Sequence, residues 1–108
     1  MNMEKNEERL LNLDFLKSLC EEEKFLSLEI FYGDCIRIKY KDLTFCFSGN
    51  YFVPDIQEVD FMDIVILIET LFKTRGFNAH IDDFMPILSV SPGFGFTLAF
   101  KISFVEKL

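Results

Sequence analysis

Residues 94–105 alternate strictly between apolar side chains and smaller or polar ones, and this pattern restricts the fold more than any other. A period of two residues places successive side chains on opposite faces of a β-strand. The segment is therefore predicted to be a long strand with one buried face, which needs neighbouring strands and a covering layer. Its apolar positions are Phe94, Phe96, Leu98, Phe100, Ile102 and Phe104.

Three shorter segments alternate in the same way, within residues 27–32, 36–41 and 44–48. Such alternation is typical of antiparallel strands that bury one face. Directly opposed residues share a face, so the loop between the first two strands has to be odd in length. A three-residue loop at residues 33–35 sets Ile30 opposite Ile38. Glu29 is then predicted to lie opposite Lys39.

The next turn has to be even in length if Ile38 is to share a face with Phe45. Either Lys41-Asp42 alone or the four residues Tyr40–Leu43 can form it. A two-residue primed turn requires positive φ angles, which suit Lys poorly. The four-residue turn is therefore favoured.

Two further segments have the period of a helix. The first helix is predicted within Glu4–Glu23, with one apolar stripe. The second is predicted from Pro54, a favoured first helical residue, to about Thr74, with Gly76 as its stop. The half of the second helix from Ile64 to Phe72 is apolar nearly all round, so this helix is expected to be largely covered. The first stripe comprises Leu11, Phe15, Leu16, Leu19 and Cys20; the second comprises Phe61, Ile64, Val65, Ile68, Leu71 and Phe72, broadened by Val59, Met62, Ile66 and Leu67.

The last part of the chain is predicted to be a hairpin. Residues 86–90 lead through the loop Ser91-Pro92-Gly93 into the strand of residues 94–105. No repeat or linker divides the chain, so residues 1–108 are predicted to form a single domain. An antiparallel sheet packed by helices defines the α+β class. The expected order is helix–βββ–helix–ββ, with the second helix packed across the sheet.

Composition indicates a cytoplasmic protein. The longest aliphatic run is Ile64–Ile68, whereas a membrane span needs about 20 residues. The N-terminal residues are acidic where a signal peptide is basic. The three cysteines, Cys20, Cys35 and Cys46, are odd in number and lack C-x-x-C spacing, unlike a disulfide framework.

The net charge of −7 argues against direct binding of nucleic acid, which requires a basic face. Arg37, Lys39 and Lys41 are a local exception. The run Gly93-Phe94-Gly95-Phe96 is similar to the start of an RNA-recognition octamer. Pro92, however, stands where that octamer has a basic residue, and the expected element order differs from βαββαβ. We therefore expect no nucleic-acid partner.

Catalytic signatures are absent from the sequence, and we expect no enzyme activity and no cofactor or metal. A triad of the Ser-His-Asp or Cys-His kind would have to use His80, the single histidine. No phosphate-binding loop occurs. The segment around His80, Asp82 and Asp83 is the only one that resembles a set of metal ligands. It is the basis of an alternative prediction, and a solvated loop is the commoner fate of such residues.

Acidic residues gather in three groups, which are the candidate partner-binding residues. Carboxylates at a helix end that repel the helix dipole cost some stability, as the first group would. If the groups converge in space, they form an acidic patch suited to a basic cleft; otherwise they are solvated helix ends. The groups are Glu21, Glu22 and Glu23; Asp55, Glu58, Asp60 and Asp63; and Asp82 and Asp83.

These features predict a small acidic, non-catalytic protein that binds and inhibits a basic, nucleic-acid-handling protein. Immunity proteins against nuclease toxins and phage inhibitors of defence nucleases fit this physical description. The 14 Phe and 3 Tyr offer aromatic anchors for such an interface. The protein is expected to be a monomer or a homodimer that does not contact membranes.

Two alternatives remain open. The element order and the acid excess resemble those of type III secretion chaperones, dimers that hold an unfolded effector segment, although the usual final helix is missing here. The third possibility is an enzyme or metal-dependent module centred on His80, Asp82 and Asp83.

Overall fold

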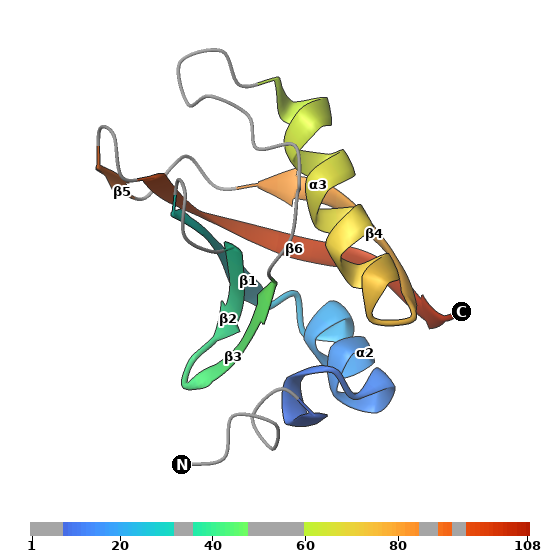
Figure 1. The fold of residues 1–108 in the computed structure, drawn as a ribbon. Coiled ribbons are helices and arrows are strands. Elements are labelled where there is room, and N and C mark those ends of the chain that lie inside the picture. Colours follow the sequence, from blue (N-terminus) through green and yellow to red (C-terminus); the bar gives the residue numbers. More distant parts are fainter. Residues whose placement is uncertain (1–7, 32–35, 48–59, 85–88, 92–94) are drawn as a thin grey trace.

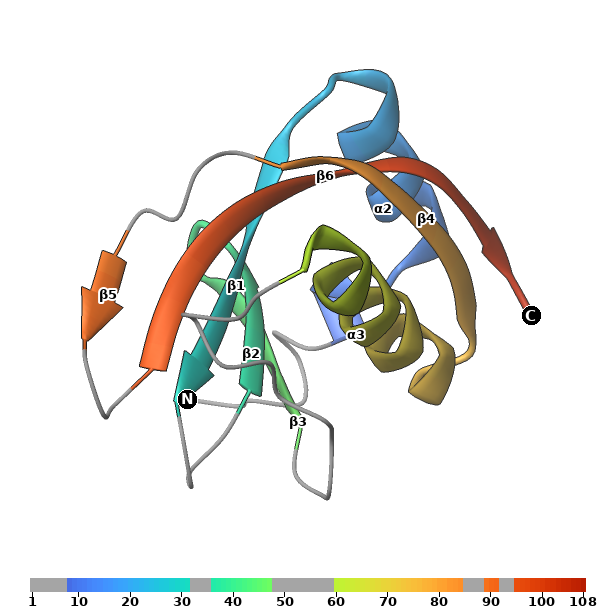
Figure 2. The ribbon, with the colours of Figure 1, turned by 90° about the horizontal axis from the view of Figure 1, so that it is seen from above.

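The fold is a curved antiparallel sheet with helix α3 on its concave side (Figures 1 and 2). The structure is a computed structural model, and it describes residues 8–31, 36–47, 60–84, 89–91 and 95–108. The α+β class and the expected sequence of elements are confirmed, with one strand, β4, added. The described elements are α2 (Leu13–Glu21), β1 (Phe25–Phe31), β2 (Ile36–Tyr40), β3 (Leu43–Phe47), α3 (Phe61–Thr74), β4 (Phe77–Phe84), β5 (Ser89–Ser91) and β6 (Gly95–Lys107).

Strand β6 is the spine of the sheet, whose order is β3-β2-β1-β6-β4. One side of β6 pairs with β1, and the other pairs with β5 near its start and with β4 along its second half. The long final strand predicted from its alternation is therefore confirmed. Ser91, which was predicted to lie in the loop, is instead the last residue of β5 and pairs with Gly95. Residues 92–94 lie outside the described residues, as do residues 85–88 between β4 and β5.

The parity of the first three strands is as predicted, but two details differ. Leu28, and not Ile30, lies opposite Ile38, so Glu29 lies opposite Arg37. The faces are unchanged, because the pairing moves by two residues. The turn between β2 and β3 consists of Lys41 and Asp42 alone, since Tyr40 pairs with Leu43. Lys41 takes a φ of 55°, so the four-residue turn was wrong.

Two bulges bend β4 against β6. His80 lies opposite Phe104 and Ile81 opposite Ile102, which leaves Ser103 extra on β6. A second shift between Ile81 and Asp83 leaves an extra residue on β4. Bulges strengthen the local twist, and these two lie where β6 and β4 arch over α3 (Figure 2). The first one also turns Phe104 outwards, to 46% exposure, against the prediction that it shares the buried face.

Helix α2 confirms the first predicted helix. Asn12 caps it by accepting a hydrogen bond from the Phe15 backbone N–H at 3.1 Å. Leu16 and Leu19 are buried in the core. The Cys20 thiol donates to the Ile102 carbonyl at 2.9 Å. The pairing of β1 with β6 ends at Lys101, so α2 continues the cover of β6 where β1 stops.

Helix α3 begins later than predicted. Asp60 is its N-cap, in an extended conformation, and accepts a hydrogen bond from the Met62 backbone N–H at 3.1 Å. The helix therefore starts at Phe61 and not at Pro54, which lies outside the described residues. Gly76 follows the helix with a φ of 89°, as expected for a stop.

The core lies between α3, α2 and the concave face of the sheet. Phe72 and Phe45 meet there edge to face, with ring centroids 5.8 Å apart, and both side chains are fully buried. Helix α3 is buried along its inner side, but one side stays open, because Met62 is 60% and Ile66 57% exposed. These two residues are four apart, so they share one outward face of the helix.

Candidate protein-binding surface

Three consecutive glutamates, Glu21–Glu23, form the C-terminal end of α2, and all three are exposed. The end has the hydrogen bonds of a Schellman motif. The Lys24 backbone N–H donates to the Leu19 carbonyl at 2.9 Å, and the Glu23 N–H donates to the Cys20 carbonyl at 3.2 Å. Glu23 occupies the left-handed position of this motif, with a φ of 54°. We call these three residues the acidic triplet.

The acidic triplet conflicts with local preferences in two ways. The left-handed position is usually a glycine, because a Cβ atom costs about 1 kcal/mol there. The C-terminal end of a helix favours cations, so three carboxylates repel its dipole. Within the described ranges, an ion pair involves only Glu23 of the triplet, whose Oε1 atom lies 3.9 Å from Lys101 Nζ. Neither Glu21 nor Glu22 pairs with another residue that the structure describes.

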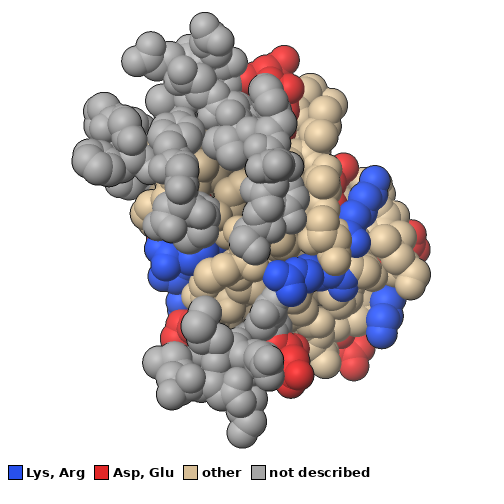
Figure 3. Space-filling model, viewed as in Figure 1, with Lys and Arg blue, Asp and Glu red and all other residues tan. Residues whose placement is uncertain are grey.

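The other acidic groups do not join the acidic triplet in one patch. Asp60 and Asp63 lie at the start of α3, at the opposite end of the molecule from α2 (Figure 1). In the view of Figure 3, acidic side chains lie mainly towards the two ends and basic ones across the middle. Asp55 and Glu58 lie outside the described residues. Asp60 and Asp63 therefore do not converge with the acidic triplet into one acidic patch.

The third acidic group is closer to the acidic triplet. Asp82 and Asp83 belong to strand β4, not to the loop that the sequence favoured. Asp83 lies opposite Lys101, whose ammonium group is near Glu23. The structure describes the backbone of Asp82 and Asp83 but not their side chains, so their place near the acidic triplet rests on the strand pairing alone.

Two exposed phenylalanines lie on the convex face of the sheet near the acidic triplet. Phe25, the first residue of β1, is 37% exposed and lies opposite Lys101, whose Nζ atom is 5.2 Å from the ring centroid. Phe104 is 46% exposed and contacts His80, with 5.6 Å between ring centroids. We call Phe25, His80, Lys101 and Phe104 the aromatic face. Sequence reasoning missed it, because alternation alone assigns Phe104 to the core.

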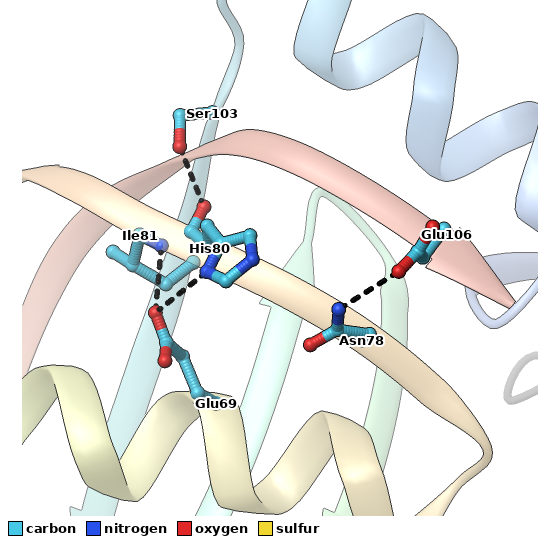
Figure 4. Close-up of polar contacts among 6 residues, drawn as sticks. All are labelled: Glu69, Asn78, His80, Ile81, Ser103 and Glu106. Carbon is cyan, nitrogen blue, oxygen red and sulfur yellow. Dashed lines mark hydrogen bonds and ion pairs between the residues drawn. The ribbon is translucent and has the colours of Figure 1, made fainter. Parts of the chain in front are cut away.

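His80 belongs to a polar cluster at the free edge of β4 (Figure 4). Glu69 Oε2 accepts a hydrogen bond from the Ile81 backbone N–H at 3.1 Å and lies 3.8 Å from His80 Nδ1. The Ser103 hydroxyl donates to the His80 carbonyl at 2.9 Å, across the bulge. The cluster therefore fixes the irregular part of β4 between α3 and β6.

The alternative of a metal site around His80 stays untested. Among the residues that the structure describes, no group of three or more His, Cys, Asp or Glu side chains is arranged to hold an ion. The Asp82 and Asp83 side chains are not among them. A thermal-shift titration with divalent ions tests the site directly, because an ion that binds the folded state raises its Tm.

The basic residues of β2 are paired on the convex face. Arg37 Nε lies 3.3 Å and Lys39 Nζ 4.0 Å from the same Glu29 oxygen. The Arg37 guanidinium also stacks over the Phe31 ring, 4.6 Å from its centroid. Glu29 offsets part of the positive charge that the sequence marked as a local exception.

Comparisons with protein-family models, curated proteins and solved structures gave no significant match. No helix in the described ranges is long and apolar enough to cross a membrane. The function of the chain therefore has to be inferred from its own surface.

Proposed function

We propose that the protein is a small acidic, non-catalytic inhibitor that binds a basic, nucleic-acid-handling protein and blocks its cleft. The acidic triplet is the observation that carries this proposal. Its three exposed carboxylates stand where the helix dipole and mutual repulsion disfavour them, and Glu23 also occupies a left-handed position that favours glycine. Conflicts between local preference and sequence concentrate at functional sites.

A basic partner relieves these conflicts. Lys and Arg side chains that ordinarily hold phosphates can form charge-assisted hydrogen bonds with carboxylates instead. A cation next to the end of α2 also interacts favourably with the helix dipole. The net charge of −7 adds a long-range attraction that steers a basic protein towards this surface. Asp55, Glu58, Asp60, Asp63, Asp82 and Asp83 contribute to this attraction in the proposal.

The proposed compartment is the cytoplasm. Cys46 is a free thiol in the described part of the chain, and an unpaired cysteine suits a reducing environment. A nuclease toxin before its secretion, or a defence nuclease, is a partner of the required charge in that compartment.

The experiment captures the partner from lysate of the native host at low salt, identifies it, and measures its affinity and activity with purified proteins. The test variant is Glu21→Gln/Glu22→Gln/Glu23→Gln. The matched control, Glu8→Gln/Asp14→Asn/Asp42→Asn, removes three exposed acidic groups elsewhere. We expect the test variant to lose about tenfold in affinity, or about 1.4 kcal/mol, and to inhibit correspondingly less. Equal losses in the two variants would contradict a role for the acidic triplet.

A second candidate is the chaperone-like dimer. The exposed Met62 and Ile66 on one face of α3 favour it, because a symmetric dimer through this helix would bury both side chains. Light scattering on the purified protein separates the candidates. A stable dimer that Ile66→Lys converts to a monomer would support the chaperone-like alternative, and a monomer at high micromolar concentration would reject it.

A further inference from the structure

The aromatic face presents two large apolar side chains on the sheet surface beside the acidic triplet. Phe25 and Phe104 are 37% and 46% exposed. Lys101 connects them in the fold, because it lies opposite Phe25 in the pairing of β1 with β6 and three positions before Phe104 on β6. Three strand residues span about 10 Å, so a single partner surface can contact both rings.

A β-bulge in β6 exposes Phe104. Ser103 is extra on β6, so Ile102 and Val105 both face the core, although they are three residues apart. Without the bulge, Phe104 would continue the buried face of Ile102. The Ser103 hydroxyl fixes the bulge through its hydrogen bond to the His80 carbonyl. The His80 ring then lies against Phe104, which restricts the ring without covering it.

The charges around the aromatic face indicate the chemistry of its occupant. The Lys101 ammonium is already near the Phe25 ring and the Glu23 carboxylate. The acidic triplet borders the face at the α2–β1 turn, with Glu23 two residues before Phe25. An exposed apolar centre with an acidic border complements a protein surface whose Lys and Arg residues surround an apolar pocket.

We infer that Phe25 and Phe104 insert into such an apolar pocket of the basic partner, while the acidic triplet contacts the cations around the pocket. This inference rests on the proposed function and adds the anchor residues and the orientation of the complex. The convex face of the sheet then meets the partner. The Met62–Ile66 face of α3, on the concave side, remains outside the interface.

The first test is photo-crosslinking with the full-length protein in native host lysate at low salt. The probes are Phe104→p-benzoylphenylalanine and Phe25→p-benzoylphenylalanine, and the control is Ile66→p-benzoylphenylalanine, which is exposed on α3. The photoreactive residue keeps an aromatic ring at positions 25 and 104, so the fold is retained. We expect both probes to crosslink to one basic protein, at sites next to its Lys and Arg residues, and the control to give no adduct with it.

The second test measures the affinity of that protein, once purified, for Phe104→Ala and for the control Ile66→Ala. We expect a loss of about tenfold or more for Phe104→Ala and less than about twofold for Ile66→Ala. Crosslinks from position 66 alone, or equal affinity losses, would overturn the inference while leaving the acidic inhibitor standing. Absence of any basic partner would overturn both.

Discussion

Arg75 at the end of α3 donates a hydrogen bond from its guanidinium to the Cys46 carbonyl on edge strand β3, at 2.8 Å. On the opposite edge, Glu69 of the same helix accepts one from the Ile81 N–H of β4, at 3.1 Å. Open sheet edges are templates for unwanted strand pairing. Helix α3 therefore ties both edges of the curved sheet with side chains of opposite charge, and it occupies polar groups that another chain could otherwise use.

Removing the Glu69 carboxylate is expected to loosen the edge at β4. Glu69→Ala leaves the Ile81 N–H without its acceptor, which we expect to lower the free energy of unfolding by about 1 kcal/mol. Glu69→Gln is the control, because an amide oxygen still accepts the bond. Hydrogen exchange at Ile81 should accelerate in Glu69→Ala and stay close to the wild-type rate in Glu69→Gln. Equal exchange in both variants would mean that the contact does not protect the edge.

Gly95 marks a close approach between β6 and β1. It has a φ of 141°, and a Cβ atom there would lie 1.8 Å from the Ile30 carbonyl oxygen. Gly95→Ala is therefore expected to cost about 3 kcal/mol or more. Gly76→Ala is the control, because Gly76 has a φ of 89° but no atom within 4 Å of an added Cβ. We expect it to cost only about 1 kcal/mol in chemical denaturation, and similar losses in both variants would contradict the steric explanation.

Glu23→Gly is expected to separate stability from binding. Glycine relieves the left-handed strain at a φ of 54° and removes a charge from the end of α2, so the free energy of unfolding should rise by about 1 kcal/mol. The same change removes one carboxylate from the acidic triplet and should weaken binding to the basic partner. Thermal denaturation and an affinity measurement on one protein sample check both effects. A more stable variant that binds as tightly as the wild type would show that Glu23 has no role in binding.

Lys41→Gly is the corresponding change outside the proposed surface. Lys41 has a φ of 55° in the turn between β2 and β3, so glycine should stabilise the protein by up to about 1 kcal/mol. Its affinity for the partner should remain unchanged, since this turn is not part of the aromatic face. A loss of affinity as large as that of Glu23→Gly would place the interface elsewhere.

Periodicity alone was sufficient to predict the α+β class, the faces of β1, β2 and β3, and the long strand β6. It failed where a single residue changes the parity of a strand. The bulge at Ser103 turns Phe104 outwards, and no local sequence signal distinguishes this arrangement from continued alternation. The two-residue turn at Lys41 was also missed. The pairing of β2 with β3 leaves only Lys41 and Asp42 for the turn, and this pairing overrides the preference of Lys against positive φ.

Sequence signals also failed to predict where α3 begins. Pro54 is a sound start signal, yet the cap at Asp60 defines the beginning of α3. Strand β4 was overlooked because His80, Asp82 and Asp83 were assigned to a solvated loop, although Phe77, Ala79 and Ile81 alternate as in a strand. Its pairing with β6 and the contact from Glu69 stabilise it. Of the candidate site, the exposure of the acidic triplet followed from the sequence, whereas its proximity to Phe25 and Lys101 required the fold.

The salt dependence of binding tests the central claim most directly. The dissociation constant of the purified complex is measured from low to high salt for the wild type, for Glu21→Gln/Glu22→Gln/Glu23→Gln, and for the matched Glu8→Gln/Asp14→Asn/Asp42→Asn control. Interactions between exposed charges weaken as salt screens them. We predict a steep loss of affinity for the wild type and the control, and a clearly shallower loss for the triplet variant. The same salt dependence in all three proteins would contradict an interface built on the acidic triplet.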